Sequence, residues 1–239
     1  MPFARLAATA LLLVPALAAN AGVIIEGKDG EETQRFLMEG KKLRMDSGKD
    51  GDAMIFDSAS QTSVQLDPGN KTYTEFTKED LAQIQAMAKG PTKKARTVKY
   101  EKTGKSDKAL GKTCDVYRVV ESGDDGEDEE QTMCVAPFAA FGMSRSDFAP
   151  FLAFGDFASQ LSGGELERSW ADLPGVPLIA WEEEDGQMRE TFRATSVEKR
   201  SVPASEFTVP AGWKKGPGFA EQMRQMKQLQ QDMQQDAGK

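Results

Sequence analysis

Short strand-like segments separated by turn residues follow one another along the chain after residue 21. Gly30, Gly40 and the sequences SGKDG and DPGN separate them, and Pro68 with Gly69 supplies the dihedral angles of a tight turn. The segments are only partly apolar. This suits a sheet with one face packed against the rest of the protein and the other face either exposed to solvent or covered by a later segment of the chain. The pattern predicts an antiparallel meander. Its strands are expected at residues 22–27, 33–40, 42–47, 52–57, 62–67 and 71–76.

A helix is expected to interrupt this meander. Thr77 and Asp80 have capping-box spacing, and the segment ends at Gly90 and Pro91. Its apolar residues on one face are Leu81, Ile84 and Met87. Further strands are expected at 96–103, 113–122, 130–136, 175–184 and 186–200. A sheet of about ten strands tends to curl, so we predict a mainly β (α+β) fold with a strongly curved antiparallel sheet.

The N-terminus has the features of a secretory signal peptide. Arg5 precedes an apolar stretch from Leu6 to Leu17, and Ala19 and Ala21 suit cleavage before Gly22. The stretch is shorter than the roughly 20 apolar residues that span a membrane, although a retained anchor is the alternative. We therefore expect residues 1–21 to be removed and the remaining protein to be exported to the periplasm as a soluble chain. No cysteine follows the cleavage region to carry a lipid.

The sequence contains two cysteines, Cys114 and Cys134. If the arms of a hairpin turn near Asp124, positions 114 and 134 face each other on the same side of the sheet, close enough for a disulfide. A register shift of two residues would keep them on that side. An oxidising compartment favours a disulfide over the alternative of two buried thiols. The acidic residues between the arms lack the ligand order of a calcium-binding loop and indicate a solvated hairpin tip.

The segment 137–162 predicts a second helix, capped by Ser146 or Asp147. Its apolar side chains cover well over half of the helix circumference, more than an ordinary surface helix carries. Such a helix needs apolar contacts on two sides: one can be the sheet, and the other either the first helix or a bound apolar ligand. The proposed lining residues are Phe141, Phe148, Phe151, Phe154, Phe157 and Leu161, together with Leu81, Ile84 and Met87. The alternative is that they form an ordinary core.

Composition argues against several classes of function. The chain has no histidine, so the common Ser-His-Asp, Cys-His and histidine-ligated zinc sites are excluded. Its formal charge is −8, and loss of Arg5 with the signal makes it more negative, which disfavours nucleic acid or anionic headgroups as partners. The Asp and Glu residues do not belong to any recognisable catalytic motif. We expect no enzyme activity, no cofactor and no metal.

Four segments carry a resemblance to a known family. They are YEKTGKSDKALGKTCDVYRVV, MCVAP, GVPL and SVPASEFTVPAGWKK. In order and spacing they resemble an uncharacterised family of exported bacterial proteins that is related to the superfamily of LolA, the outer-membrane lipoprotein carrier. The resemblance runs from about Gly22 to Lys215 and implies a curved half-barrel, with helices closing its concave face over an apolar cavity. In characterised relatives that cavity takes acyl chains of lipoproteins or lipids.

The last segment, 216–239, is rich in methionine and glutamine. Its apolar residues fall within about 120° on a helical wheel, which predicts an amphipathic helix that docks on the domain or on a partner; a disordered tail is the alternative. Three regions are therefore expected: the signal peptide (1–21), a LolA-like domain (22–215) and this tail.

Two hypotheses for function follow from these features. The first is a periplasmic binding or carrier protein for an acyl chain, a lipid or a lipoprotein in an apolar cavity. The second is a protein–protein interaction module of the cell envelope with no cargo, which meets its partner through the curved sheet or the terminal helix.

Overall fold

The computed structural model describes residues 21–48, 51–87, 96–122, 128–161, 166–168, 172–184, 186–218 and 221. The expected signal peptide therefore lies outside the described residues except for residue 21. The expected terminal helix lies outside them except for residues 216–218 and 221. No helix within the described ranges has both the length and the apolarity needed to cross a membrane.

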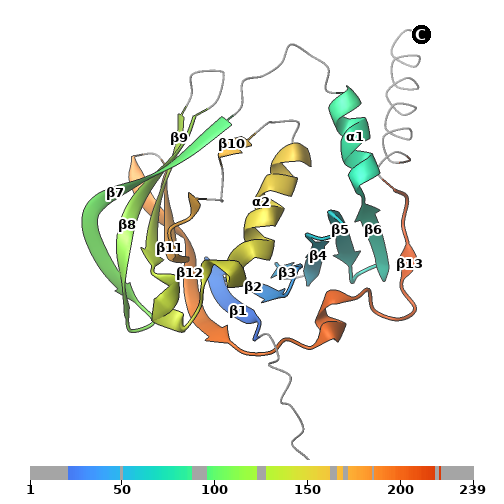
Figure 1. Ribbon diagram of the computed structural model, residues 1–239, viewed down its shortest axis with the longest axis horizontal. Helices are drawn as coiled ribbons and strands as arrows, with labels where there is room; N and C mark the ends of the chain where they lie inside the picture. Colours follow the sequence, from blue (N-terminus) through green and yellow to red (C-terminus); the bar gives the residue numbers. More distant parts are fainter. Residues whose placement is uncertain are drawn as a thin grey trace, which may run out of the picture.

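The described residues form one open, mixed sheet of thirteen strands that curves around a helix (Figure 1). The strand order is β10-β7-β8-β9-β11-β12-β1-β2-β3-β4-β5-β6-β13. The first six strands are β1 (Val23–Asp29), β2 (Glu32–Glu39), β3 (Lys42–Ser47), β4 (Asp52–Asp57), β5 (Thr62–Asp67) and β6 (Thr72–Phe76). The others are β7 (Arg96–Ala109), β8 (Lys112–Ser122), β9 (Asp128–Ala136), β10 (Leu166–Arg168), β11 (Val176–Glu184), β12 (Gln187–Lys199) and β13 (Lys214–Lys215). The mainly β fold and the meander are confirmed.

The expectation of a wholly antiparallel sheet is wrong at both edges. The edge strand β10 pairs with β7 in parallel, and β13 pairs with β6 in parallel. Edge strands leave backbone N–H and C=O groups unpaired, and short segments from distant parts of the chain meet some of them here. The backbone N–H of Gly216, for example, donates to the carbonyl of Tyr73 at 2.7 Å.

Helix α1 (Lys78–Met87) begins as the sequence predicts. The backbone N–H of Thr77 donates to the Asp80 carboxylate at 2.8 Å, and the Asp80 N–H donates to the Thr77 hydroxyl at 3.3 Å. These reciprocal bonds are those of a capping box.

The phenylalanine-rich segment forms two 3₁₀ turns, η1 (Phe138–Phe141) and η2 (Arg145–Phe148), followed by helix α2 (Ala149–Leu161). The expected cap at Ser146 or Asp147 is wrong by a few residues, because Ser144 precedes the first turn of η2 and is the capping residue. Its backbone N–H and its hydroxyl both donate to the Asp147 carboxylate, at 2.7 and 2.9 Å.

Alternating side chains of the first strands enter different apolar clusters. The α2 cluster contains Val23, Ile25, Met38, Leu43 and Phe56 together with Phe148 and Phe157. The ring of Phe151 meets Phe36 of β2 at 6.0 Å between centroids, and Phe154 meets Phe56 of β4 at 5.5 Å. Helix α2 therefore packs against β2 to β4.

The C-terminal segment covers the other side chains of these strands. Ile24, Leu37, Ala53, Ile55 and Leu66 pack with Val202 and Phe207 in a second cluster, beside Val209 and Trp213. The short η4 turn (Ala204–Phe207) lies in this segment. Both faces of the meander are thus buried, one by α2 and one by residues that follow β12.

Cys114 and Cys134 form the disulfide that the sequence predicts. The expected direct opposition is wrong, however, because Cys134 pairs with Val116 in the β8–β9 register. The register is shifted by two residues, so the cysteines lie on the same face as diagonal neighbours. Their Cα atoms are 5.3 Å apart, which is within the usual range for a disulfide.

Candidate functional site

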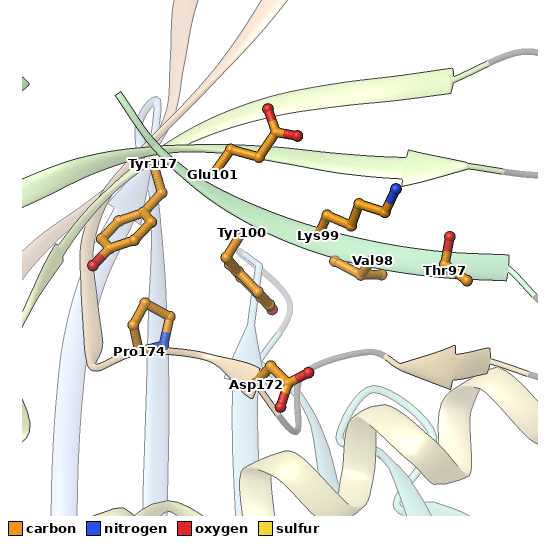
Figure 2. Close-up of a pocket in the computed structure, with 8 residues that line it drawn as sticks. All are labelled: Thr97, Val98, Lys99, Tyr100, Glu101, Tyr117, Asp172 and Pro174. Carbon is orange, nitrogen blue, oxygen red and sulfur yellow. The ribbon is translucent and has the colours of Figure 1, made fainter. Parts of the chain in front are cut away.

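An open pocket of about 920 Å³ lies between strand β7, strand β8 and the segment that precedes β11. Figure 2 shows Tyr100 and Tyr117 on the side of the strands that faces Asp172 and Pro174, whereas Lys99 and Glu101 extend away from them. The lining residues are Thr97, Val98, Lys99, Tyr100, Glu101, Tyr117, Asp172 and Pro174.

The two tyrosines belong to an apolar surface of the sheet. Val98 and Tyr100 are spaced by two along β7, so they share a face, and Tyr117 lies on the neighbouring strand β8. All three are half-buried and pack beside the pocket cluster, which consists of Val119, Met133, Val135 and Ala180. An apolar surface therefore continues from the pocket into the core of this half of the sheet.

Charged side chains on the opposite face of β7 and β8 are paired. Arg118 donates to Glu101 at 2.8 Å and to Glu130 at 3.1 Å, which links β7, β8 and β9. The hydrogen bond to Glu101 and the negative charges of Glu130 and Glu101 raise the pKa of the Arg118 guanidinium further. Glu101 is therefore paired with Arg118, and Asp172 is the exposed carboxylate on the other wall.

The segment that bears Asp172 and Pro174 is held in place by its neighbours. Leu173 is fully buried, and Nη1 of Arg145 donates to its carbonyl at 3.2 Å. Gly175 approaches β9 so closely that a Cβ atom there would overlap the carbonyl group of Ala136. This wall of the pocket is consequently fixed by buried contacts on both sides of Pro174.

The lining combines aromatic and aliphatic surface with a few charged groups at the rim. Such a surface suits a ligand with an apolar body and a polar end. The arrangement can therefore bind such a ligand. Within the described ranges, no three His, Cys, Asp or Glu side chains gather as metal ligands.

The residues expected to line an apolar cavity lie elsewhere. Phe148 and Phe157 are buried in the α2 cluster, at 1% and 2% exposure. Phe141, Phe151 and Phe154 are partly buried and pack against that cluster. The side chains of Leu81, Ile84, Met87 and Leu161 lie outside the described residues.

None of the expected lining residues whose side chains are described borders the pocket. Sequence reasoning missed Tyr100 and Tyr117. The signal that could have indicated them is the alternation of Val98 and Tyr100 with charged residues along the expected strand at 96–103.

Asp147 joins the start of the phenylalanine-rich helical segment to the sheet. Besides accepting two hydrogen bonds from Ser144, the capping residue of η2, its carboxylate accepts a hydrogen bond from Nζ of Lys199 at 2.9 Å, at the end of β12. Partial burial acts to raise the pKa of Asp147, but the hydrogen bonds from Ser144 and Lys199 outweigh it and hold the pKa below its ordinary value.

We expect Asp147→Asn to lower the free energy of unfolding at neutral pH by about 1 kcal/mol, the usual effect of a lost cap. A carboxylate with a lowered pKa stabilises the fold above its unfolded pKa, near 4, and this contribution is lost as the pH falls through the folded pKa. Urea unfolding at pH 7 and pH 3 should therefore show a difference from wild type that shrinks at the lower pH. The exposed Asp52 at the start of β4 provides the control, Asp52→Asn. A difference independent of pH would contradict the role given to the Asp147 charge.

Comparison with known proteins identifies a family and no activity. Residues 23–213 match the family described as "Domain of unknown function (DUF4412)". No curated protein matches the chain. A solved crystal structure of an uncharacterised conserved protein from Thermus thermophilus is similar, with a TM-score of 0.42 and 7% identity. The similarity covers 82% of this chain and 90% of that one.

Proposed function

We propose that this chain, which belongs to the DUF4412 family, is a binding or carrier protein for an apolar group: an acyl chain, a lipid or the acyl end of a lipoprotein. The observation that carries the proposal is the open pocket of about 920 Å³ beside Tyr100 and Tyr117. Ligand pockets commonly have volumes of about 300–1,000 Å³, and half of the residues that line this one, Val98, Tyr100, Tyr117 and Pro174, are apolar or aromatic.

Two further features support this proposal. Four segments of the sequence resemble an uncharacterised exported family that is related to the LolA superfamily, whose characterised members take acyl chains. The curved sheet with α2 packed against β2 to β4 is compatible with a LolA-like half-barrel closed by helices. On this proposal the acyl group lies along Val98, Tyr100 and Tyr117, and the polar end of the ligand remains near Asp172 at the rim.

We also propose that the protein is exported to the periplasm and that it binds its ligand without catalysing a reaction. The basis is the signal-like N-terminus and the lack of histidine in the whole sequence. An activity screen tests the second part: a turnover that survives repurification and disappears on replacing one Asp or Glu would overturn it.

Native mass spectrometry of protein purified from the cell envelope tests the proposed cargo directly. We expect a co-purified lipid mass that is lost on denaturation. If no such mass is found and the protein binds no acyl probe, the carrier proposal fails. A cell-envelope interaction module without cargo then takes its place.

Replacing Tyr117 tests the location of the site. We expect Tyr117→Thr to weaken binding of a fluorescent fatty acid by about tenfold, because the ligand loses contact with an aromatic ring. Threonine suits a strand, so the fold should persist. Tyr73→Thr on β6 is the matched control, since Tyr73 is also half-buried but packs against the second cluster, which contains Val202 and Phe207. Equal affinities of the two variants would place the ligand away from this pocket.

A further inference from the structure

The turn that joins β7 to β8 exposes an apolar side chain among lysines. Leu110 at this turn is 37% exposed. Lys108 and Lys112 are exposed next to this turn, and Lys105 is exposed further along β7. Ala109 pairs with Lys112, and Lys108 pairs with Thr113, so Lys108 and Lys112 lie on opposite faces of the hairpin. We call Leu110 and these three lysines the hairpin tip.

Leu110 has an unusual backbone conformation for an apolar residue. Its φ is +51°, and that of Gly111 is +69°. This left-handed region is unfavourable for a side chain such as leucine and is tolerated better by asparagine or glycine. The other non-glycine residues with positive φ in the described ranges are Gln61 and Lys71, both polar. The tip therefore keeps an exposed leucine at a position where a polar residue would fit more easily.

The positive charges of the tip lysines are not used in ion pairs among the described residues, so they can interact with a partner. Among the described residues, Lys102 forms an ion pair with Asp115 at 2.7 Å, whereas no ion pair involves Lys105, Lys108 or Lys112. Lys112 lies over the ring of Phe141, with Nζ 5.9 Å from its centroid. The neighbouring acid is Asp107, which accepts a hydrogen bond from the Lys108 backbone and lies near the positive charge of Arg193.

The acidic side chains of β9 and β11 lie at the other end of the strands. Glu130 pairs with Val120, and Glu182 to Glu184 end β11 beside the same end of β9. Eight residues of β8 separate Val120 from Lys112, a distance of about 26 Å. The Debye length at physiological ionic strength is about 8 Å. The acidic side chains of β9 and β11, whose charge disfavours anionic headgroups, are therefore screened at Lys112.

We propose that the hairpin tip docks on a membrane surface that contains anionic lipids. Lysines next to such a surface are attracted to its headgroups, and one inserted apolar side chain adds to the binding. A stable protein partner usually requires an interface of more than about 1,000 Å², which a narrow turn does not offer by itself. Met188 is more exposed, at 54%, but it pairs across the ladder with Glu183, next to Glu182, so the β11–β12 turn lacks this charge complementarity. The docking does not depend on whether the pocket holds cargo.

Co-sedimentation with vesicles tests this proposal. The exported chain should bind vesicles of phosphatidylcholine with phosphatidylglycerol, bind pure phosphatidylcholine weakly, and dissociate as salt is raised. Each lysine near such a surface raises the partition coefficient between vesicles and solution by about fivefold. Replacing Lys105, Lys108 and Lys112 together by glutamine should therefore lower it by at least tenfold. Leu110→Asn should lower it several-fold while keeping the turn, because asparagine accepts a positive φ.

Matched variants distinguish a specific effect of the hairpin tip on vesicle binding from an effect of overall charge or of any exposed apolar side chain. One control replaces three exposed lysines outside the tip by glutamine and so removes the same charge elsewhere: Lys28, Lys41 and Lys71. The other, Met188→Asn, removes an exposed apolar side chain at the opposite end of the strands. Both should partition like wild type. Equal losses in the two lysine variants would overturn the proposal, as would equal binding to both kinds of vesicle. Binding to neither kind would also overturn it, and would leave an acidic protein as the partner of the tip.

Discussion

Replacing Phe148 by alanine is expected to lower the free energy of unfolding by about 3–5 kcal/mol. Phe148 is 1% exposed, and its ring lies 5.0 Å from that of Phe138 and 6.1 Å from that of Phe151, measured between centroids. These neighbours belong to a short helical turn and to α2, which cannot both move into the space left by the ring. Urea unfolding of the wild type and the variant measures the loss.

Phe154→Ala is the matched comparison for this prediction. Phe154 comes from the same helical segment and also contacts an aromatic ring, that of Phe56, but it is only partly buried. Less contact is lost there, so we expect a smaller decrease in stability. Similar losses at both positions would show that α2 is buried more uniformly than the structure indicates. A small loss at Phe148 would contradict its place in the core.

Much of the meander could be predicted because its signals are local. The bounds expected at 42–47, 52–57 and 62–67 are those of β3, β4 and β5. Glycine and proline turns separate these strands, and the capping box of Thr77 and Asp80 is a contact between residues three apart. Each signal acts within a few residues, so a single sequence contains it.

The missed elements depend on contacts between distant segments. β10 and β13 have three and two residues, too few to show periodicity, and each pairs in parallel with a strand far away in the sequence. β7 was expected to end at residue 103 but continues to Ala109, because a register irregularity between Lys102 and Ser106 lets the strand pass Gly104. The hydroxyl of Thr103 donates to the carbonyl of Val116 at 2.8 Å at this irregularity.

The candidate site was harder to predict than the fold for the same reason. The wide apolar surface of α2 indicated a helix with two apolar neighbours, and its rings do meet strands β2 and β4. The pocket, however, forms where Pro174 lies opposite Tyr117, and these residues are far apart in sequence. No spacing rule connects a loop before β11 with a face of β7 and β8. Only the alternation along β7 was available from the sequence.

Breaking the disulfide between Cys114 and Cys134 is expected to lower the free energy of unfolding by about 3 kcal/mol in the chain-entropy model. The bond closes a loop with a sequence separation of 20 and ties the start of β8 to the end of β9. Intact mass with and without reductant establishes the pairing. Urea unfolding of the oxidised and the reduced protein then gives the stability difference.

The reduced wild type is the sharpest comparison for this prediction, because only the covalent bond differs between the two forms. Both cysteines are fully buried, and reduction removes no side-chain atom from the core, although the two sulfur atoms move apart to van der Waals contact. The double variant Cys114→Ala, Cys134→Ala removes the bond and also leaves small cavities, so we expect it to be less stable than the reduced protein. If oxidised and reduced forms unfold at the same urea concentration, the β8–β9 register is held by its ladder and its side-chain contacts alone. In that case the bond adds nothing to the half of the sheet that carries both Tyr117 and the hairpin tip.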